Sequence, residues 1–218
     1  MRNLVFSIFL VPLFALSQSV NDVDTKGNKQ GIWQKTYNNG TIRYKGQFKD
    51  NIPYGIFNYY YSTGELEIEK EFFHSGEASA THMFYKDGQL KASGLYVNEL
   101  KDSTWNYYNN DNIMIMSEQY QKGKLNGTTK TFYYNGSLYE IKKWEKDVEQ
   151  GKWVQYFING GTKMEVTFKN GLREGQVVYF HPNGNMYCSG FYASDLRSGV
   201  WKYFSKDGVV DTIINYNE

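Results

Sequence analysis

The chain has 218 residues, 18% of them aromatic, and its 24 lysines and arginines stand against 23 aspartates and glutamates. That length and aromatic content are enough to bury a core, which excludes a disordered tail. Acids and bases are mixed along a nearly neutral chain, so nucleic acid or strong membrane binding is not expected.

The first 17 residues have the features of a cleavable secretory signal. A cationic start at Arg2 precedes an apolar run from Leu4 to Leu16, and small residues follow around Ser17. The apolar run is too short to span a bilayer comfortably, so an uncleaved anchor is the weaker alternative. We expect an exported bacterial protein, periplasmic, cell-surface or secreted, that begins at Gln18. Without Arg2 its formal net charge is 23 − 23 = 0.

Residues 18–30 form a polar lead-in that is expected to cap the structure that follows. Asp22 and Asp24 begin like a calcium-binding loop. However, Lys26 occupies a ligand position and Trp33 stands where the closing glutamate belongs, so no calcium site is expected.

From residue 31 onward the sequence repeats every 24 residues without insertion or deletion. The eight units span 31–54, 55–78, 79–102, 103–126, 127–150, 151–174, 175–198 and 199–218. Each has an Asn-Gly-like corner, such as "FYYNG" at 132–136. The turn glycines are Gly40, Gly64, Gly88, Gly136, Gly160, Gly184 and Gly208, with Asn112 in their place in the fourth unit. Such pairs are typical of two-residue type I′ turns, so each unit is predicted to be one β-hairpin.

Counting outward from each corner predicts the cross-strand partners. Gly31 lies opposite Phe48, and Trp33 lies opposite Gly46. The position of Phe48 is aromatic in all eight units, and a ring opposite a glycine can cover exposed backbone. The prediction is an all-β fold, an elongated twisted antiparallel meander of about sixteen strands at about 4.8 Å spacing.

The alternation of side chains along a strand assigns residues to two faces. One face is expected to hold the tryptophans, the corner aromatics Tyr37, Tyr61, Tyr85, Tyr133 and Phe157, the aromatic at the Phe48 position, and an apolar set: Ile42, Leu66, Leu90, Met114, Leu138, Met186 and Val210. The other face is mainly polar, with residues such as Arg43, Glu67 and Lys91. It also carries one aromatic row, the candidate binding row: Tyr60, Phe84, Tyr108, Phe132, Tyr156, Phe180 and Phe204. The apolar face must be covered, by curling, by tight twisting or by dimerisation.

The pattern G-x-W-x-x-x-Y-x-x-G…G-x-F, as in "GIWQKTYNNGTIRYKGQF" at 31–48, resembles the MORN repeat, and more closely its bacterial variant. The resemblance covers residues 31–218. Units three and four begin with serine, and Thr81 and Thr129 stand where tryptophan is typical, which weakens packing locally. The resemblance implies a hairpin array that serves as a binding or scaffolding surface, with no catalytic residues to carry over. Some relatives carry an antitoxin label.

The sequence offers no catalytic constellation, no metal site and no cofactor motif. His74, His82 and His181 fall at different places in the unit and do not converge. The sole cysteine, Cys188, excludes an internal disulfide and is interpreted as a small core residue. The chain is therefore not expected to be an enzyme.

Three functions follow as hypotheses. The first is an exported scaffold that binds another protein, or itself as a dimer, at the cell envelope. The second is glycan or cell-wall binding, in which rings of the row stack on successive sugars of a polysaccharide. The third is an antitoxin-like partner protein, which export makes less favourable because the toxin would act in the cytoplasm.

Overall fold

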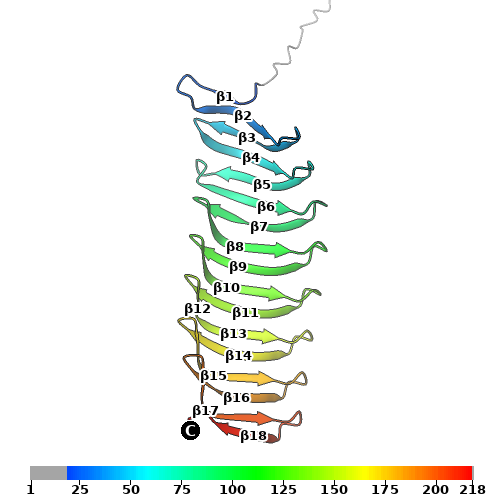
Figure 1. Ribbon diagram of the computed structural model, residues 1–218, viewed down its shortest axis with the longest axis vertical. Coiled ribbons are helices and arrows are strands. Elements are labelled where there is room, and N and C mark those ends of the chain that lie inside the picture. The colour runs from blue at the N-terminus through cyan, green and yellow to red at the C-terminus, as the bar shows by residue number, and fades with distance from the viewer. Residues whose placement is uncertain (1–18, 218) are drawn as a thin grey trace, which may run out of the picture.

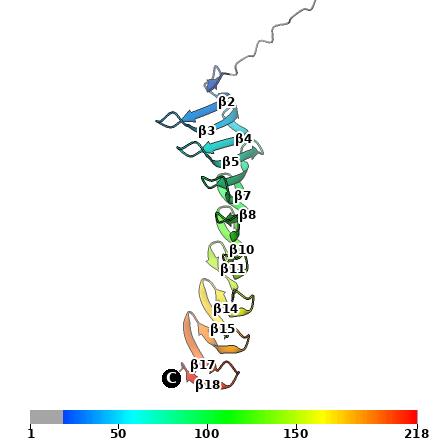
Figure 2. The same ribbon diagram turned by 90° about the vertical axis from the view of Figure 1, so that its right-hand side faces the viewer.

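The structure, a computed structural model, describes residues 19–217, which form one antiparallel sheet and no helix (Figure 1). Consecutive strands pair side by side along the long axis, which confirms the predicted all-β meander. The sheet is a single layer that twists from one end to the other (Figure 2). The expected signal segment, residues 1–17, lies outside the described residues.

Eighteen strands make up this sheet, two more than the sixteen expected. The lead-in contributes β1, and one strand is interrupted at Gln150, which separates β12 from β13. The strands are β1 Asp22–Val23, β2 Lys29–Thr36, β3 Ile42–Lys49, β4 Ile52–Tyr60, β5 Leu66–Phe73, β6 Ala78–Phe84, β7 Leu90–Val97, β8 Leu100–Tyr108, β9 Met114–Gln121, β10 Lys124–Phe132, β11 Leu138–Glu145, β12 Val148–Glu149, β13 Gly151–Tyr156, β14 Thr162–Lys169, β15 Leu172–Phe180, β16 Met186–Ala193, β17 Leu196–Phe204 and β18 Val210–Asn215.

The Asn-Gly corners are longer than the two-residue type I′ turns that the sequence suggested. In the first unit the Gly40 N–H donates to Tyr37 O, and the Tyr37 N–H donates to Thr41 O, which closes a three-residue loop. Gly40 has a positive φ of 86°, whereas Asn39 before it does not. This is a type I turn followed by a glycine bulge, the usual form of a three-residue hairpin loop.

The longer corner moves side chains to the other face near it. Thr36 pairs with Ile42 and Lys35 pairs with Tyr44, so Arg43 is an extra residue that restores the register. Directly opposed residues share a face. The apolar set was therefore assigned to the wrong face: Leu66 lies opposite Tyr60, and each of the others except Ile42 lies opposite its unit's row aromatic. Arg43 instead stacks over the corner ring of Tyr37, 5.9 Å from its centroid.

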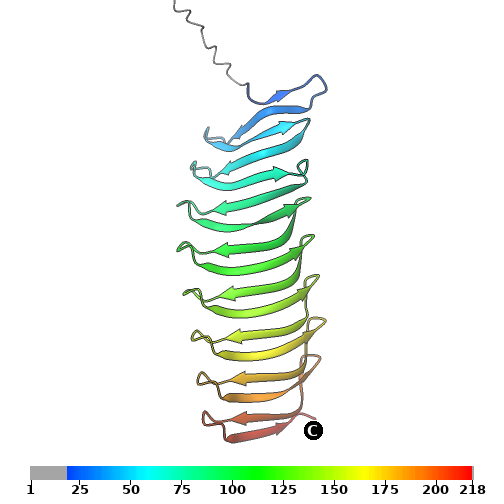
Figure 3. The same ribbon diagram turned by 180° about the vertical axis from the view of Figure 1, so that it is seen from behind.

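Type I′ geometry occurs at the other margin of the sheet, in the turns that join successive units. Lys49 pairs with Ile52 across Asp50 and Asn51, whose φ angles are 52° and 66°. Two positive φ angles in a two-residue loop define this turn. The corners form one long margin of the sheet and the joining turns form the other (Figure 3).

The register away from the corners is as predicted. Gly31 pairs with Phe48, and Trp33 pairs with Gly46. Each unit, however, also packs against the preceding one. A Cβ atom on Gly94 would lie 2.3 Å from the Trp105 ring, and one on Gly190 would lie 2.2 Å from the Trp201 ring. Both tryptophans are fully buried, 0% exposed. The rings lie flat on the backbone of the preceding unit, so the sheet covers much of its own apolar face.

Where the ring is missing, the residue that it would cover is larger. Thr81, Thr129 and Val177 occupy the ring position in units three, five and seven. The residues in the glycine position of the preceding units are Lys70, Glu118 and Val166. In these pairs a smaller residue at the ring position leaves room for a larger one at the glycine position, as close packing requires. The sixth unit differs, because Trp153 follows Lys142, whose ammonium lies 4.4 Å from the centroid of that ring. The face built from these pairs is called the ring face below, and the opposite one the row face.

Candidate binding faces

The seven row aromatics lie in register on the row face, one at the corner end of each of the strands β4, β6, β8, β10, β13, β15 and β17. All seven are half-buried. Six of them lie opposite an aliphatic residue or methionine, and Tyr156 lies opposite Thr162. Rings and aliphatic side chains thus alternate across the strands in an apolar band, interrupted only at Thr162, on a mainly polar face.

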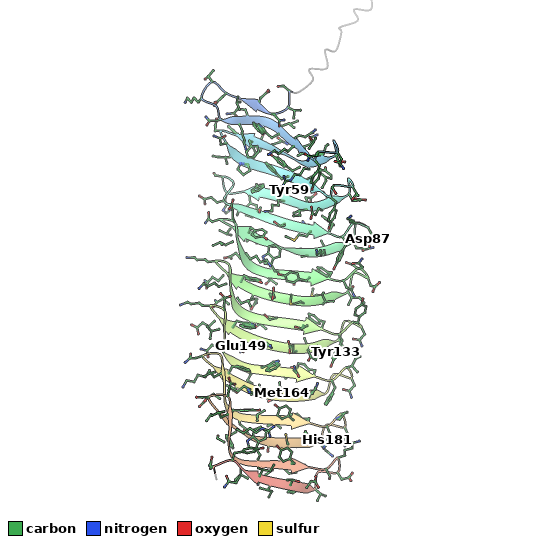
Figure 4. All side chains as sticks on the ribbon, in the orientation of Figure 1. Tyr59, Asp87, Tyr133, Glu149, Met164 and His181 are labelled. Atoms are coloured by element: carbon green, nitrogen blue, oxygen red, sulfur yellow. The ribbon has the colours of Figure 1, made fainter. Side chains whose placement is uncertain are left out.

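A ladder of side-chain hydrogen bonds holds the backbone of the row. The hydroxyls of Tyr37, Tyr61, Tyr85 and Tyr133 donate to the carbonyls of Tyr60, Phe84, Tyr108 and Tyr156, at 2.8 to 2.9 Å. His181 Nε2 lies 3.0 Å from Phe204 O in the same way. Tyr133 and His181 lie along the corner margin (Figure 4). The doublet "FY" therefore supplies a row ring and a hydroxyl that anchors the next row residue. The 24-residue recurrence of the tyrosine was the signal for this role.

The ladder is tested by two adjacent tyrosines. Tyr133→Phe removes a hydroxyl that bonds 2.8 Å from Tyr156 O, and a hydrogen bond of this kind contributes about 1 kcal/mol. Tyr134 is 73% exposed, so Tyr134→Phe is expected to change the free energy of unfolding by less than about 0.5 kcal/mol. Urea unfolding followed by circular dichroism compares them; equal effects would contradict the ladder.

Six cations lie over aromatic rings on the ring face. They are Lys29, Lys70, Lys101, Lys142, Arg173 and Arg197, each 4.2 to 4.8 Å from at least one ring centroid. Such contacts stabilise a cation most when it is partly removed from water. The sequence analysis did not foresee them, because these residues occupy more than one position of the unit.

Acidic groups pair with two of these cations. Glu149 pairs with Lys142 at 3.5 Å, and Asp195 pairs with Arg173 at 2.8 Å. The hydrogen bonds from Arg173 lower the pKa of the Asp195 carboxyl. Burial, assisted by a hydrogen bond to Glu118, raises the pKa of Tyr120 to about 12. These groups form a packed structural network, and such networks also shift pKa values.

The third unit breaks the pattern and leaves a pocket of about 330 Å³ on the ring face. Its joining loop is longer, and β6 pairs with β5 without the bulge that other units have there. Lys70, Phe57, Phe72 and Tyr96 line the pocket. Burial lowers the pKa of Lys70, while the charge of Glu99 opposes that shift. The pocket also holds Glu77 and Glu99, so one basic and two acidic side chains line it.

The remaining candidates for chemistry stay apart. Within residues 19–217 no three His, Cys, Asp or Glu side chains gather as metal ligands. Asp24 accepts hydrogen bonds from the backbone of Lys26 and Asn28, which makes it a turn-forming residue. Cys188 lies in the core cluster around Trp201, where burial raises the pKa of its thiol. None of the described residues belongs to a helix with the length and hydropathy that a bilayer crossing requires.

Comparison with protein families agrees with the geometry of the hairpins. The family model described as MORN repeat variant matches residues 29–50, 125–146 and 173–193. No curated protein matches the chain. MORN repeats are non-catalytic modules that generally bind proteins or membranes.

Proposed function

Because the chain is a MORN-repeat protein, we propose that it is an exported, non-enzymatic scaffold that binds another protein along its row face at the cell envelope. The observation that supports this is the apolar band of half-buried rings and aliphatic side chains in register along the row face. The ladder of hydroxyls fixes the band on a rigid sheet. A preorganised surface loses little conformational entropy on binding. The apparent secretory signal supports export and the envelope as the place of action.

A pull-down from the native envelope tests this proposal. The bait is the mature chain, beside the triple variant Tyr108→Ala, Phe132→Ala and Tyr156→Ala. Hot-spot residues typically lose 2 kcal/mol or more on truncation, so loss of three rings is expected to lower partner recovery at least tenfold. The matched control is Tyr54→Ala with Tyr134→Ala, two exposed tyrosines outside the row. Equal recovery by all three baits, or no partner above background, would contradict the proposal.

The spacing of the row favours glycan binding as the second candidate. Rings on every second strand are about 9.6 Å apart, a distance that suits stacking on alternate sugars of a polymer. The same triple variant should then lose retention on cell-wall polysaccharide and keep its circular dichroism spectrum. Unchanged retention would exclude the row as a glycan site. The aliphatic or methionine side chains that lie opposite six of the seven rings make protein binding the better-supported choice.

A further inference from the structure

The two ends of the sheet differ in how their edge strands are protected. At the N-terminal end the two-residue strand β1 pairs with β2, and Val20 bridges to Ile32. Trp33 Nε1 donates to Asp22 O at 3.1 Å, which ties this cap down. At the other end β18 is the edge strand of the sheet that residues 19–217 form (Figure 1), and all six of its residues are exposed. A long open edge is a template for pairing with another strand.

Exposed apolar side chains concentrate at the same end. Of the 20 large apolar residues exposed in the described part of the chain, nine lie from Tyr187 onward: Tyr187, Phe191, Leu196, Val200, Val209, Val210, Ile213, Ile214 and Tyr216. Ile213 is 59% exposed, and Asp211 is the only charged residue of β18. Proteins usually protect an open edge with lysine, proline or a short strand. This edge has the composition of an interface.

We propose that β18 pairs with β18 of a second copy, antiparallel about a two-fold axis at Ile213, so that one sheet runs through both chains. This goes beyond the proposed scaffold function and does not depend on it.

Backbone geometry selects this register. The Tyr216 N–H donates to Gly199 O, so by the alternation of antiparallel strands Ile214 and Thr212 also direct their backbone groups to β17. The N–H and C=O of Ile213 therefore point to the open edge. With the axis at Ile213, the two Ile213 residues exchange a pair of hydrogen bonds, and Thr212 lies opposite Ile214 of the second copy at a non-hydrogen-bonded site.

Side chains fit the same register. Ile213 meets Ile213 on the row face, and the β-branched Thr212 and Ile214 meet on the ring face. Asp211 lies opposite Asn215 of the second copy, so like charges do not meet directly across the interface. Because β1 closes the N-terminal end, association stops at two chains.

The expected dimer is weak, because pairing of one short strand buries less than the roughly 1,200–2,000 Å² of stable interfaces. Analytical ultracentrifugation of the mature chain should show a monomer–dimer equilibrium with a dissociation constant in the micromolar range. Ile213→Lys places two like charges opposite each other and should raise that constant at least tenfold. The matched control is Ile158→Lys, at a corner residue of 61% exposure, which should leave the equilibrium unchanged. A monomer at all concentrations to about 0.5 mM, or equal behaviour of both variants, would overturn the proposal.

A disulfide experiment tests the register independently of stability. An oxidised equimolar mixture of Thr212→Cys and Ile214→Cys chains should give a heterodimer on a non-reducing gel, because cross-strand Cα atoms at a non-hydrogen-bonded site are about 4.5 Å apart. Each variant alone should stay largely monomeric, since its own cysteines lie two residues out of register. The natural Cys188 is buried and does not compete. Equal cross-linking of the mixture and the single variants would overturn the assigned axis. Partner capture by the row face is a separate readout, so either proposal can fail alone.

Discussion

Gly94→Val is expected to lower the free energy of unfolding by about 3 kcal/mol, the upper part of the range for an overpacked core. A Cβ on Gly94 would lie 2.3 Å from Cδ2 of Trp105, a ring that is fully buried and held by its Nε1–H bond to Leu95 O at 3.0 Å. The ring cannot move without losing that bond and its contact with Tyr96, whose ring centroid is 4.9 Å away. The neighbouring Ser93→Val, on the row face, is the matched control and should change stability by less than about 0.5 kcal/mol.

The companion experiment is a double-mutant cycle. Trp105→Val alone leaves a cavity and should cost about 3 kcal/mol. Combined with Gly94→Val it reproduces the natural Val166 and Val177 pair, so the double variant should be about 2 kcal/mol more stable than the sum of the single effects predicts. Urea unfolding of the four proteins measures this coupling. Additive losses would mean that the glycine and the ring are not complementary partners.

The period and the main register of the fold were predictable because they depend on residue spacing. A strict 24-residue repeat fixes where each strand turns, and counting from the corner placed Gly31 opposite Phe48 correctly. The predicted turn type was wrong, but the predicted strand pairing away from the corner was correct. The extra residue of the three-residue corner is offset by the bulge at Arg43, so the error affected only residues next to the corner. Counting residues cannot distinguish the two corner geometries, because both give the same strand pairing in the rest of the hairpin.

The contacts between units could not be derived from hairpin counting. Counting gives the partner within a hairpin, whereas Trp105 packs on Gly94 of the preceding unit, where a bulge shifts the register between Ser93 and Leu95. The pair Lys70 and Thr81 is a sequence signal for these contacts, because a large residue stands at the glycine position and a small one at the tryptophan position of the following unit. It becomes meaningful only once the neighbouring strand is known.

The sequence predicted the row as a set of aligned rings, but it did not predict which residues lie opposite those rings. The sequence placed Tyr60 to Phe204 on one face, and the sheet holds them there, each at the corner end of the first strand of its hairpin. The aliphatic residues opposite them were assigned elsewhere, because the bulge moves Leu66 across the sheet. The row is consequently a mixed apolar band on an anchored backbone, which is the reason to prefer a protein ligand to a sugar polymer.

Deleting whole units should test how far stability depends on matching neighbours rather than on length. Removal of residues 79–126 brings Lys70 beside Thr129, the same kind of pair as the natural Lys70 and Thr81. That chain should fold into a sheet shorter by about 19 Å, four strands at about 4.8 Å each. Removal of residues 103–126 alone brings Gly94 beside Thr129 and leaves the space of a tryptophan ring empty, at a local cost of about 3–5 kcal/mol.

Hydrogen exchange at the new junction distinguishes these outcomes, because in a linear array each unit is stabilised chiefly by its neighbours. The 24-residue deletion should lose protection around Gly94, although it keeps more units than the 48-residue deletion. Adding Thr129→Trp to the shorter deletion restores a ring over Gly94 and should recover protection there. If protection instead followed the number of units, or if the added tryptophan had no effect, complementarity between successive units would not be what stabilises this sheet. If this single ring restores protection around Gly94, each 24-residue unit is stabilised by the unit that follows it.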